Sequence, residues 1–341
     1  MNQNKCKGCG SYLIFSPENQ ILKCTHCENS EKIDNLIPSQ NLVKSYSENY
    51  SITPKEDESR HYECTSCGNI MIIDDETRKR CPSCGDKALA PKRQGVFIPD
   101  GTIPFAISSI QAKTHFSNWI KKRIFAPNNL KKLAKLGKIS GMYSPAWSYN
   151  FSMIGSYSGQ VSWREQVSKD KYRTRTKSVS GKINENFEDV LTTGNNQISS
   201  ETLNNSAPYN CETSVNYDSR LLLGFSGLDT NINPHTAHEE MIKTTTKQIE
   251  RQLRLELGSG KYSVDYLNVS VKPTNEKLKY LFLPIYASHY TYKNKKYHTY
   301  INGQNGTTTG TYPKSFWKIF FFILGIITAI LGLGALIASA T

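Results

Sequence analysis

Residues 6–27 read CKGCGSYLIFSPENQILKCTHC and place four cysteines in two tight pairs. A Cys-x-x-Cys turn can direct two sulfurs at one metal ion, and four thiolates about 2.3 Å from the metal suit a closed tetrahedral zinc site. The short runs YLIF and ILK between the pairs have the composition of β-strands. The spacing therefore predicts a zinc ribbon over residues 1–30, a hairpin too small to fold without its metal.

The same pattern returns in residues 64–84, with 13 residues between the two pairs in place of 14. We therefore predict a second ribbon over residues 61–90 and two structural zinc ions in all. A four-thiolate site keeps no coordination position open, so neither ion activates water. Disulfides, redox-active pairs and a rubredoxin-like iron site are the alternatives. The predicted ligands are Cys6, Cys9, Cys24 and Cys27 in the first ribbon and Cys64, Cys67, Cys81 and Cys84 in the second.

The first 100 residues are nearly neutral, with 13 Lys/Arg against 14 Asp/Glu, a net charge of −1. The remaining 241 residues hold 29 against 15, a net charge of +14. Nucleic-acid binding needs clustered positive charge, so the neutral ribbons favour protein docking as their role. Residues 31–60 between the ribbons are polar and include Pro38 and Pro54, which predicts a flexible linker and two ribbons that move independently.

Residues 95–312 are predicted to form one α+β domain with a tyrosine-rich antiparallel sheet. Apolar and aromatic residues alternate through two stretches that turn near residues 169–170 and 294–295, as in β-hairpins. Between them, residues 235–257 carry an apolar stripe and are followed by Gly258, which predicts a long helix capped at that glycine. The fold class of the chain is therefore α+β.

Residues 106–138 hold eight Lys/Arg and no acidic residue, over two short predicted helices. Such a segment is either an ordinary surface with solvated lysines, a contact with anionic lipid headgroups, or a contact with nucleic acid. The sequence leaves these three interpretations open.

No motif in the chain predicts catalysis. His235-x-x-His238-Glu239 has the wrong order and spacing for the His-Glu-x-x-His zinc motif, and no P-loop, Rossmann or Gly-x-Ser-x-Gly pattern occurs. The ninth cysteine, Cys211, has no cysteine neighbour and is predicted to be a buried or idle thiol. We therefore expect neither enzymatic activity nor a small-molecule substrate.

The C-terminal residues 319–338 contain no charged side chain and would form a helix about 30 Å long, enough for one bilayer core. Phe316 and Trp317 precede this run as interfacial anchors, and Lys314 and Lys318 flank it. The positive-inside rule then predicts a single-pass protein of the cell membrane with its bulk on the cytoplasmic side. Zinc thiolates agree with that side, because the cytosol keeps cysteines reduced.

The whole arrangement resembles a family of bacterial membrane-anchored zinc-ribbon proteins of the TFIIB type. The segments that carry the resemblance are the paired ribbons, IPFAISSIQAKTHFSNWIKKRIFAPNNLKKLAKLGKISGMYSPAWSYN, and YLFLPIYASHYTYKNKKYHTYINGQNGTTTGTYPKSFWK. One departure is Ala146, where an aromatic residue is expected. The resemblance implies SPFH (flotillin-like) and PspA-like protein partners and a role in envelope stress, and it supplies no catalytic residue.

These inferences lead to the hypothesis of a membrane-anchored adaptor or scaffold. The span would hold the protein at the inner face, and the ribbons would dock protein partners. The alternative hypothesis is a membrane-associated nucleic-acid-binding protein, with the ribbons as readers and residues 113–138 as phosphate contacts.

Overall fold

The computed structural model describes residues 5–34, 36–38, 44–47, 61–66, 70–73, 81, 89–92, 97–133, 139–169 and 171–340. The described chain is mixed α+β, as predicted, and most of its strand pairs are antiparallel. The strands form a three-stranded sheet near the N-terminus and a twelve-stranded sheet that includes most of the remaining chain.

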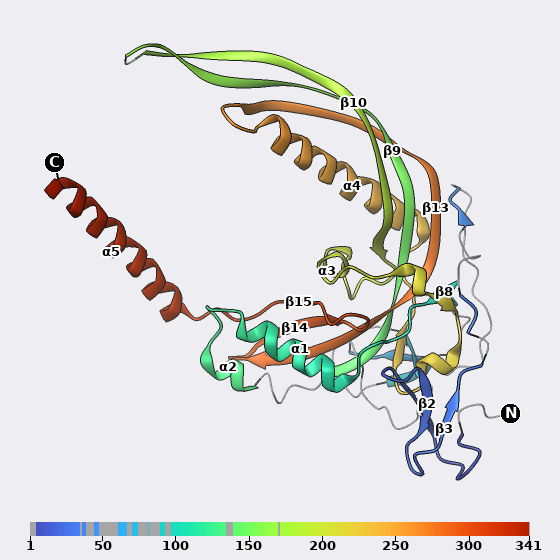
Figure 1. Ribbon diagram of the computed structural model, residues 1–341. Helices are drawn as coiled ribbons and strands as arrows, with labels where there is room; N and C mark the ends of the chain where they lie inside the picture. The colour runs from blue at the N-terminus through green and yellow to red at the C-terminus, as the bar shows by residue number, and fades with distance from the viewer. Residues whose placement is uncertain are drawn as a thin grey trace.

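The large sheet is built on two 30-residue strands, β9 (Ile139–Ser168) and β13 (Ser263–Tyr292). They pair antiparallel from Ile139↔Ser288 to Ser162↔Ser263. A strand of this length extends about 100 Å. The long strand β10 (Lys171–Thr193) pairs with the other side of β9. β9 ends at Ser168 and β10 begins at Lys171, which agrees with the hairpin predicted there. The three strands form a curved arm that projects from the rest of the molecule (Figure 1).

The helix α4 (Pro234–Leu257) lies along the inside of this curve (Figure 1). Asn233 caps its first turn by accepting from the Thr236 N–H, and Gly258 ends it, as predicted. The buried positions recur at helical spacing, so one stripe faces the sheet. That stripe packs against an apolar cluster of the arm that includes Trp147, Tyr149, Phe151, Met153, Ile183, Leu267 and Tyr280.

The far end of β13 continues through a tight turn into β14 (Lys295–Asn302) and then β15 (Thr308–Gly310). Lys293 and Asn294 have φ angles of 47° and 62°, so the predicted hairpin turn uses two left-handed residues. The domain also contains several short strands and helices. They are β8 (Gly101–Thr102), α3 (Ser200–Asn205), η2 (Cys211–Thr213), β11 (Val215–Asn216) and η3 (Ser219–Leu222).

The basic segment forms α1 (Ser109–Lys121) and α2 (Asn128–Leu133). The side chain of Ile110 on α1 is 74% exposed. The buried residues are Ala112, Phe116 and Ile120. A capping box of Ser108 and Gln111 starts the helix at Ser109.

The first ribbon consists of β1 (Leu13–Ser16), β2 (Ile21–Cys24) and β3 (Ser30–Lys32), and it packs directly on the large sheet. Phe15 and Phe225 meet edge to face, and Phe225 also stacks on Phe105 with ring centroids 4.1 Å apart. Gly141 on β9 permits this packing, because a Cβ there would lie 2.4 Å from the Phe225 ring. The ribbon and the sheet therefore share one core, which also holds Leu13, Leu22, Ile33, Tyr143, Leu222, Phe282 and Tyr286.

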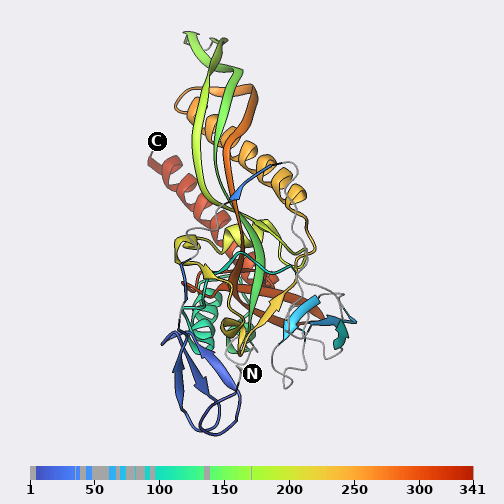
Figure 2. The ribbon, with the colours of Figure 1, turned by 90° about the vertical axis from the view of Figure 1, so that its right-hand side faces the viewer.

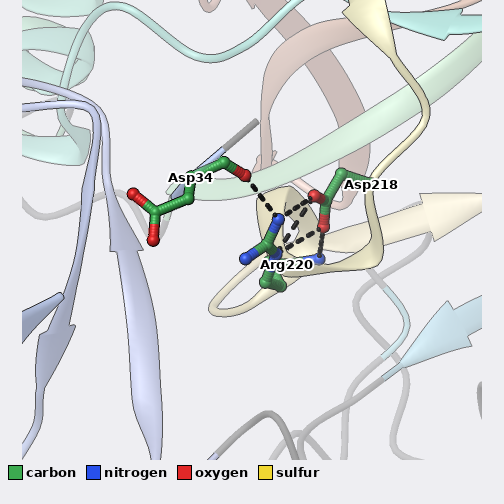
Figure 3. Close-up of polar contacts among 3 residues, drawn as sticks. All are labelled: Asp34, Asp218 and Arg220. Atoms are coloured by element: carbon green, nitrogen blue, oxygen red, sulfur yellow. Dashed lines mark hydrogen bonds and ion pairs between the residues drawn. The ribbon is translucent and has the colours of Figure 1, made fainter. Parts of the chain in front are cut away.

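A polar contact lies at the edge of the interface between the first ribbon and the domain (Figure 3). The guanidinium of Arg220 binds both carboxylate oxygens of Asp218, with 2.6 Å between Nη2 and Oδ2. The same Nη2 donates to the backbone carbonyl of Asp34 at 3.1 Å, and the Asp34 carboxylate points away. The hydrogen bonds that Arg220 donates to the Asp218 carboxylate raise the pKa of Arg220, so the guanidinium stays charged.

The second ribbon joins the large sheet through its backbone. Its described strands are β5 (His61–Cys64), β6 (Ile70–Ile73) and β7 (Leu89–Lys92), with β5 between the other two. β6 pairs with β12 (Ser226–Leu228), and β12 in turn runs parallel to β9. Both ribbons are thus attached to the domain, which differs from the expectation that they move independently.

The predicted linker of residues 31–60 is described only in part. Pro38 forms a bridge with Val215, and β4 (Lys44–Ser45) pairs with β13. Lys44 also binds Asp100 at 2.6 Å. Residues 35, 39–43 and 48–60 of the predicted flexible linker lie outside the described residues.

The C-terminal helix α5 (Phe316–Ala340) extends away from the sheet (Figures 1 and 2). At its start the Ser315 N–H donates to the Phe125 carbonyl, and Lys318 Nζ donates to the Ala126 carbonyl. Its large apolar side chains are exposed from Phe316 to Leu331. Across the residues that the structure describes, no helix is both long enough and apolar enough to cross a membrane.

Replacing Phe225 by alanine should loosen the first ribbon. The change empties a site that contacts both Phe15 and Phe105, and such core truncations cost about 3–5 kcal/mol. We expect faster amide hydrogen exchange in β1 and β2 and a lower denaturation midpoint. Ile110→Ala, at an exposed position, should change stability by less than about 0.5 kcal/mol. Unchanged exchange in β1 and β2 would contradict the shared core.

Candidate metal centre

The first ribbon brings its four cysteines together at the ends of two turns. β1 pairs with β2 from Leu13↔Cys24 to Ser16↔Ile21, which places the two Cys-x-x-Cys turns side by side. Each turn ends in a left-handed residue, Gly10 with φ 73° and Glu28 with φ 57°. Glycine adopts this conformation without steric cost, which explains the Cys-x-x-Cys-Gly of the first turn. Glu28 adopts it with a side chain, so the second turn is the more strained of the two.

The sulfur atoms have the spacing of a tetrahedral site. All four Sγ atoms lie within 4.8 Å of one another. Two of the distances are 3.6 Å, from Cys6 to Cys27, and 3.4 Å, from Cys9 to Cys24. In a tetrahedral zinc thiolate centre, neighbouring sulfurs are about 3.8 Å apart. The four residues predicted for the first site therefore fit one metal ion.

Backbone amides favour the thiolate form of two ligands. The Gly8 N–H donates to Cys6 Sγ, and the His26 N–H donates to Cys24 Sγ, both at 3.4 Å. Amides of Cys27 and His26 lower the pKa of Cys24 to about 6, and amides of Cys9 and Gly8 lower the pKa of Cys6. Cys24 is therefore ionised at neutral pH even before a metal binds.

The surroundings of Cys27 instead favour its protonated thiol. The Asn29 amide favours its thiolate, but the neighbouring Cys9, Cys24 and Cys6 together raise the pKa of Cys27 to about 12. Four negative sulfurs this close repel one another unless a cation lies among them. A divalent ion would remove that repulsion, so binding must release protons from the ribbon.

The centre has a buried side and an exposed side. Cys6 and Cys24 belong to the core shared with the large sheet, whereas Cys9 and Cys27 face solvent. With four sulfur ligands, no position remains for water or a substrate. The arrangement therefore suits a structural metal that fixes the ribbon surface packed against Phe225.

The second predicted site is described only in part. Cys64 and Cys81 are buried, while Cys67 and Cys84 lie outside the described residues. Within the described residues, one cluster of three or more metal-binding side chains occurs, and it is the first site. The second zinc ion remains a prediction.

The histidines of the rejected zinc motif have another role. His235 Nδ1 lies 3.0 Å from the Tyr46 hydroxyl, and His238 stacks on the Tyr46 ring at 3.8 Å. His238 also pairs with Glu276 on β13. The cluster thus holds the segment after β4 against α4 and the arm. No local sequence pattern indicates this cluster, because Tyr46 lies 189 residues from His235.

Cys211 is a buried thiol, as predicted. Its burial raises its pKa to about 12. A thiol that stays protonated at neutral pH is a weak nucleophile, which agrees with a packing role.

We expect purified protein to contain about two zinc ions per chain, one from each predicted site. Cys24→Ser should lose one ion and lose protection of the first ribbon, because this sulfur lies in the shared core. Cys211→Ala should keep both ions. Elemental analysis with a thiol titration would measure this, and full metal content in Cys24→Ser would exclude the first site.

Zinc affinity should fall as the pH is lowered. Below about pH 6 Cys24 is protonated in the metal-free ribbon, so zinc must displace one more proton than at higher pH. Because of this additional proton, the zinc affinity should fall by a further factor of about ten for each pH unit. Competition against a chelator between pH 5.5 and 8 would measure the slope. His26→Ala keeps its backbone N–H and should keep the profile; an altered profile would assign the titration to the imidazole instead.

Comparison with known proteins yields one relative. No protein-family model matches the chain, and no solved structure matches it. The chain is 25% identical over 325 residues to the uncharacterized protein YdjG of Bacillus subtilis (strain 168), covering 94% of this chain and 93% of the relative. The likeness extends over nearly the whole length of both chains. It supports the expected similarity to a YdjG-type protein.

Proposed function

We propose that the protein is a membrane-anchored scaffold that presents a metal-stabilised platform on the cytoplasmic side. The observation that carries this proposal is α5, a 25-residue helix whose described apolar side chains are exposed from Phe316 to Leu331, apart from the half-buried Ile319. Exposure of such an apolar surface to water is energetically unfavourable, and a bilayer or a partner helix would cover it. Residues 319–338 carry no charge, which favours the bilayer.

Within the described residues no helix is long and apolar enough to span a membrane. The described side chains of α5 end at residue 332. The proposed anchor extends over the whole helix. Lys314 and Lys318 at its start, and Trp317 between them, are the residues expected at a cytoplasmic interface. The thiol ligands of the first ribbon agree with that reducing side.

The scaffold role follows from the packing of the ribbons. A four-sulfur centre without an open position supports structure and not chemistry. Since the first ribbon shares a core with the sheet, its metal would stiffen a surface held at a fixed distance from the anchor. Confinement to a membrane raises the effective concentration of partners, so weak docking suffices. The resemblance described above suggests SPFH and PspA-like proteins as partners, in envelope stress.

Charges placed in α5 should release the protein from membranes. Ile323 and Ile327 are exposed on this helix, and an arginine at each costs about 3 kcal/mol in a bilayer. We expect the wild-type chain to resist carbonate extraction, and Ile323→Arg/Ile327→Arg to be soluble. Leu255→Arg, at an exposed apolar position on α4, should stay with the membrane.

The same preparations test the scaffold role. Proteins recovered with the wild-type chain from detergent extracts should be lost with Cys24→Ser, which disrupts the ribbon surface but keeps α5. If carbonate releases the wild-type chain from membranes, the proposed membrane anchor is wrong. Equal partner recovery by Cys24→Ser would remove the ribbon.

A further inference from the structure

The outer edge of β10 is open. In the described part of the chain β10 pairs with β9 on one side and with no other strand. Its register with β9 is continuous from Tyr172 to Phe187, without a bulge. Alternate residues of such a strand turn their N–H and C=O groups outward, where a further strand could bind them. Proteins usually shorten, bulge or cover such edges, and this one is long and regular.

The open edge is also strongly basic. Residues 161–182 hold seven Lys/Arg against two Asp/Glu, a net charge of +5. Arg173, Arg175 and Lys177 alternate along β10, are exposed, and lie on the same face as the buried Ile183. Their side chains are spaced by about 6.8 Å, two residues of a strand. One acidic group faces them across the strand pair, Glu165, which binds Arg175 at 2.7 Å.

The unpaired backbone edge and its positive charge together indicate the kind of partner. A second copy pairing edge to edge would place cations opposite cations, which is destabilising. A phosphate polymer or a lipid headgroup would satisfy the charge but supplies no N–H donors for the strand edge. An extended polypeptide with acidic residues at alternate positions satisfies both the backbone and the charges.

We propose that the outer edge of β10, over residues 172–182, docks an acidic extended segment of a partner protein as an additional strand. The acidic residues would face Arg173, Arg175 and Lys177. The alternate positions would face Tyr172, Thr174 and Thr176 on the other side of the strand. Aromatic and β-branched residues pair well across strands, so threonine or valine suits those positions.

A synthetic peptide of alternating threonine and glutamate tests this on the full-length protein in detergent. We expect it to bind at physiological salt and to slow amide hydrogen exchange within residues 172–182. The variant Arg173→Glu/Arg175→Glu/Lys177→Glu should bind at least about tenfold more weakly. It should gain affinity for the corresponding threonine–lysine peptide. A matched variant, Lys113→Glu/Lys247→Glu/Lys272→Glu, carries the same change in net charge at exposed positions away from this edge and should bind normally.

Backbone N-methylation of the acidic peptide keeps its charges and removes its N–H donors, so it should abolish binding. Equal binding by the methylated peptide would overturn strand addition. So would protection located outside residues 172–182, or no preference over the lysine peptide. Short oligothymidylate and phosphatidylglycerol vesicles complete the test. Stronger binding of either, lost in the same triple variant, would assign the basic edge to nucleic acid or lipid and overturn the proposal.

Discussion

The antiparallel pairing of β9 with β13 is the constraint on which every other part of the structure depends. At its base the pair separates two apolar clusters, with Tyr143 and Phe282 in one and Met142 and Leu281 in the other. A slip of one residue would exchange these faces, so packing on both sides fixes the register. Farther out, one face is covered by α4 and the other faces solvent. The same two strands thus serve as the core of a domain and as the spine of an arm.

The two ribbons are joined to this spine by different physical means. The first attaches mainly through side chains, with Phe15 against Phe225 and the Arg220 cross-link to the Asp34 carbonyl, and adds one backbone hydrogen bond from the Phe15 N–H to the Leu223 carbonyl. The second attaches through the backbone ladder from β6 to β12 and on to β9. In the first, the metal ligands Cys6 and Cys24 belong to the shared core, so metal binding and domain packing stabilise each other.

Two exposed surfaces stand out from an otherwise ordinary exterior. The apolar helix α5 and the basic edge of β10 both leave groups in water that a partner would cover. Their chemistry differs, since the helix surface lacks charge and the strand edge has an excess of positive charge. The two proposals therefore give them different partners, a bilayer for the helix and an acidic strand for the edge.

The sequence by itself determined the elements that depend on local chemistry. Four cysteines at fixed spacing identify the first metal site, because ligand chemistry is local to two turns. Likewise Gly258 marks the end of α4, and the turns near residues 169 and 294 mark the hairpins. The α+β class follows from the two hydrophobic periodicities.

Tertiary structure alone decided how far each strand runs and what the ribbons touch. Alternation predicts a strand but does not limit its length, and 30-residue strands are far above the usual five or six. Docking of Phe15 on Phe225 and of Tyr46 between two histidines joins residues about 200 positions apart. Such contacts arise from complementary surfaces, and no local pattern encodes them.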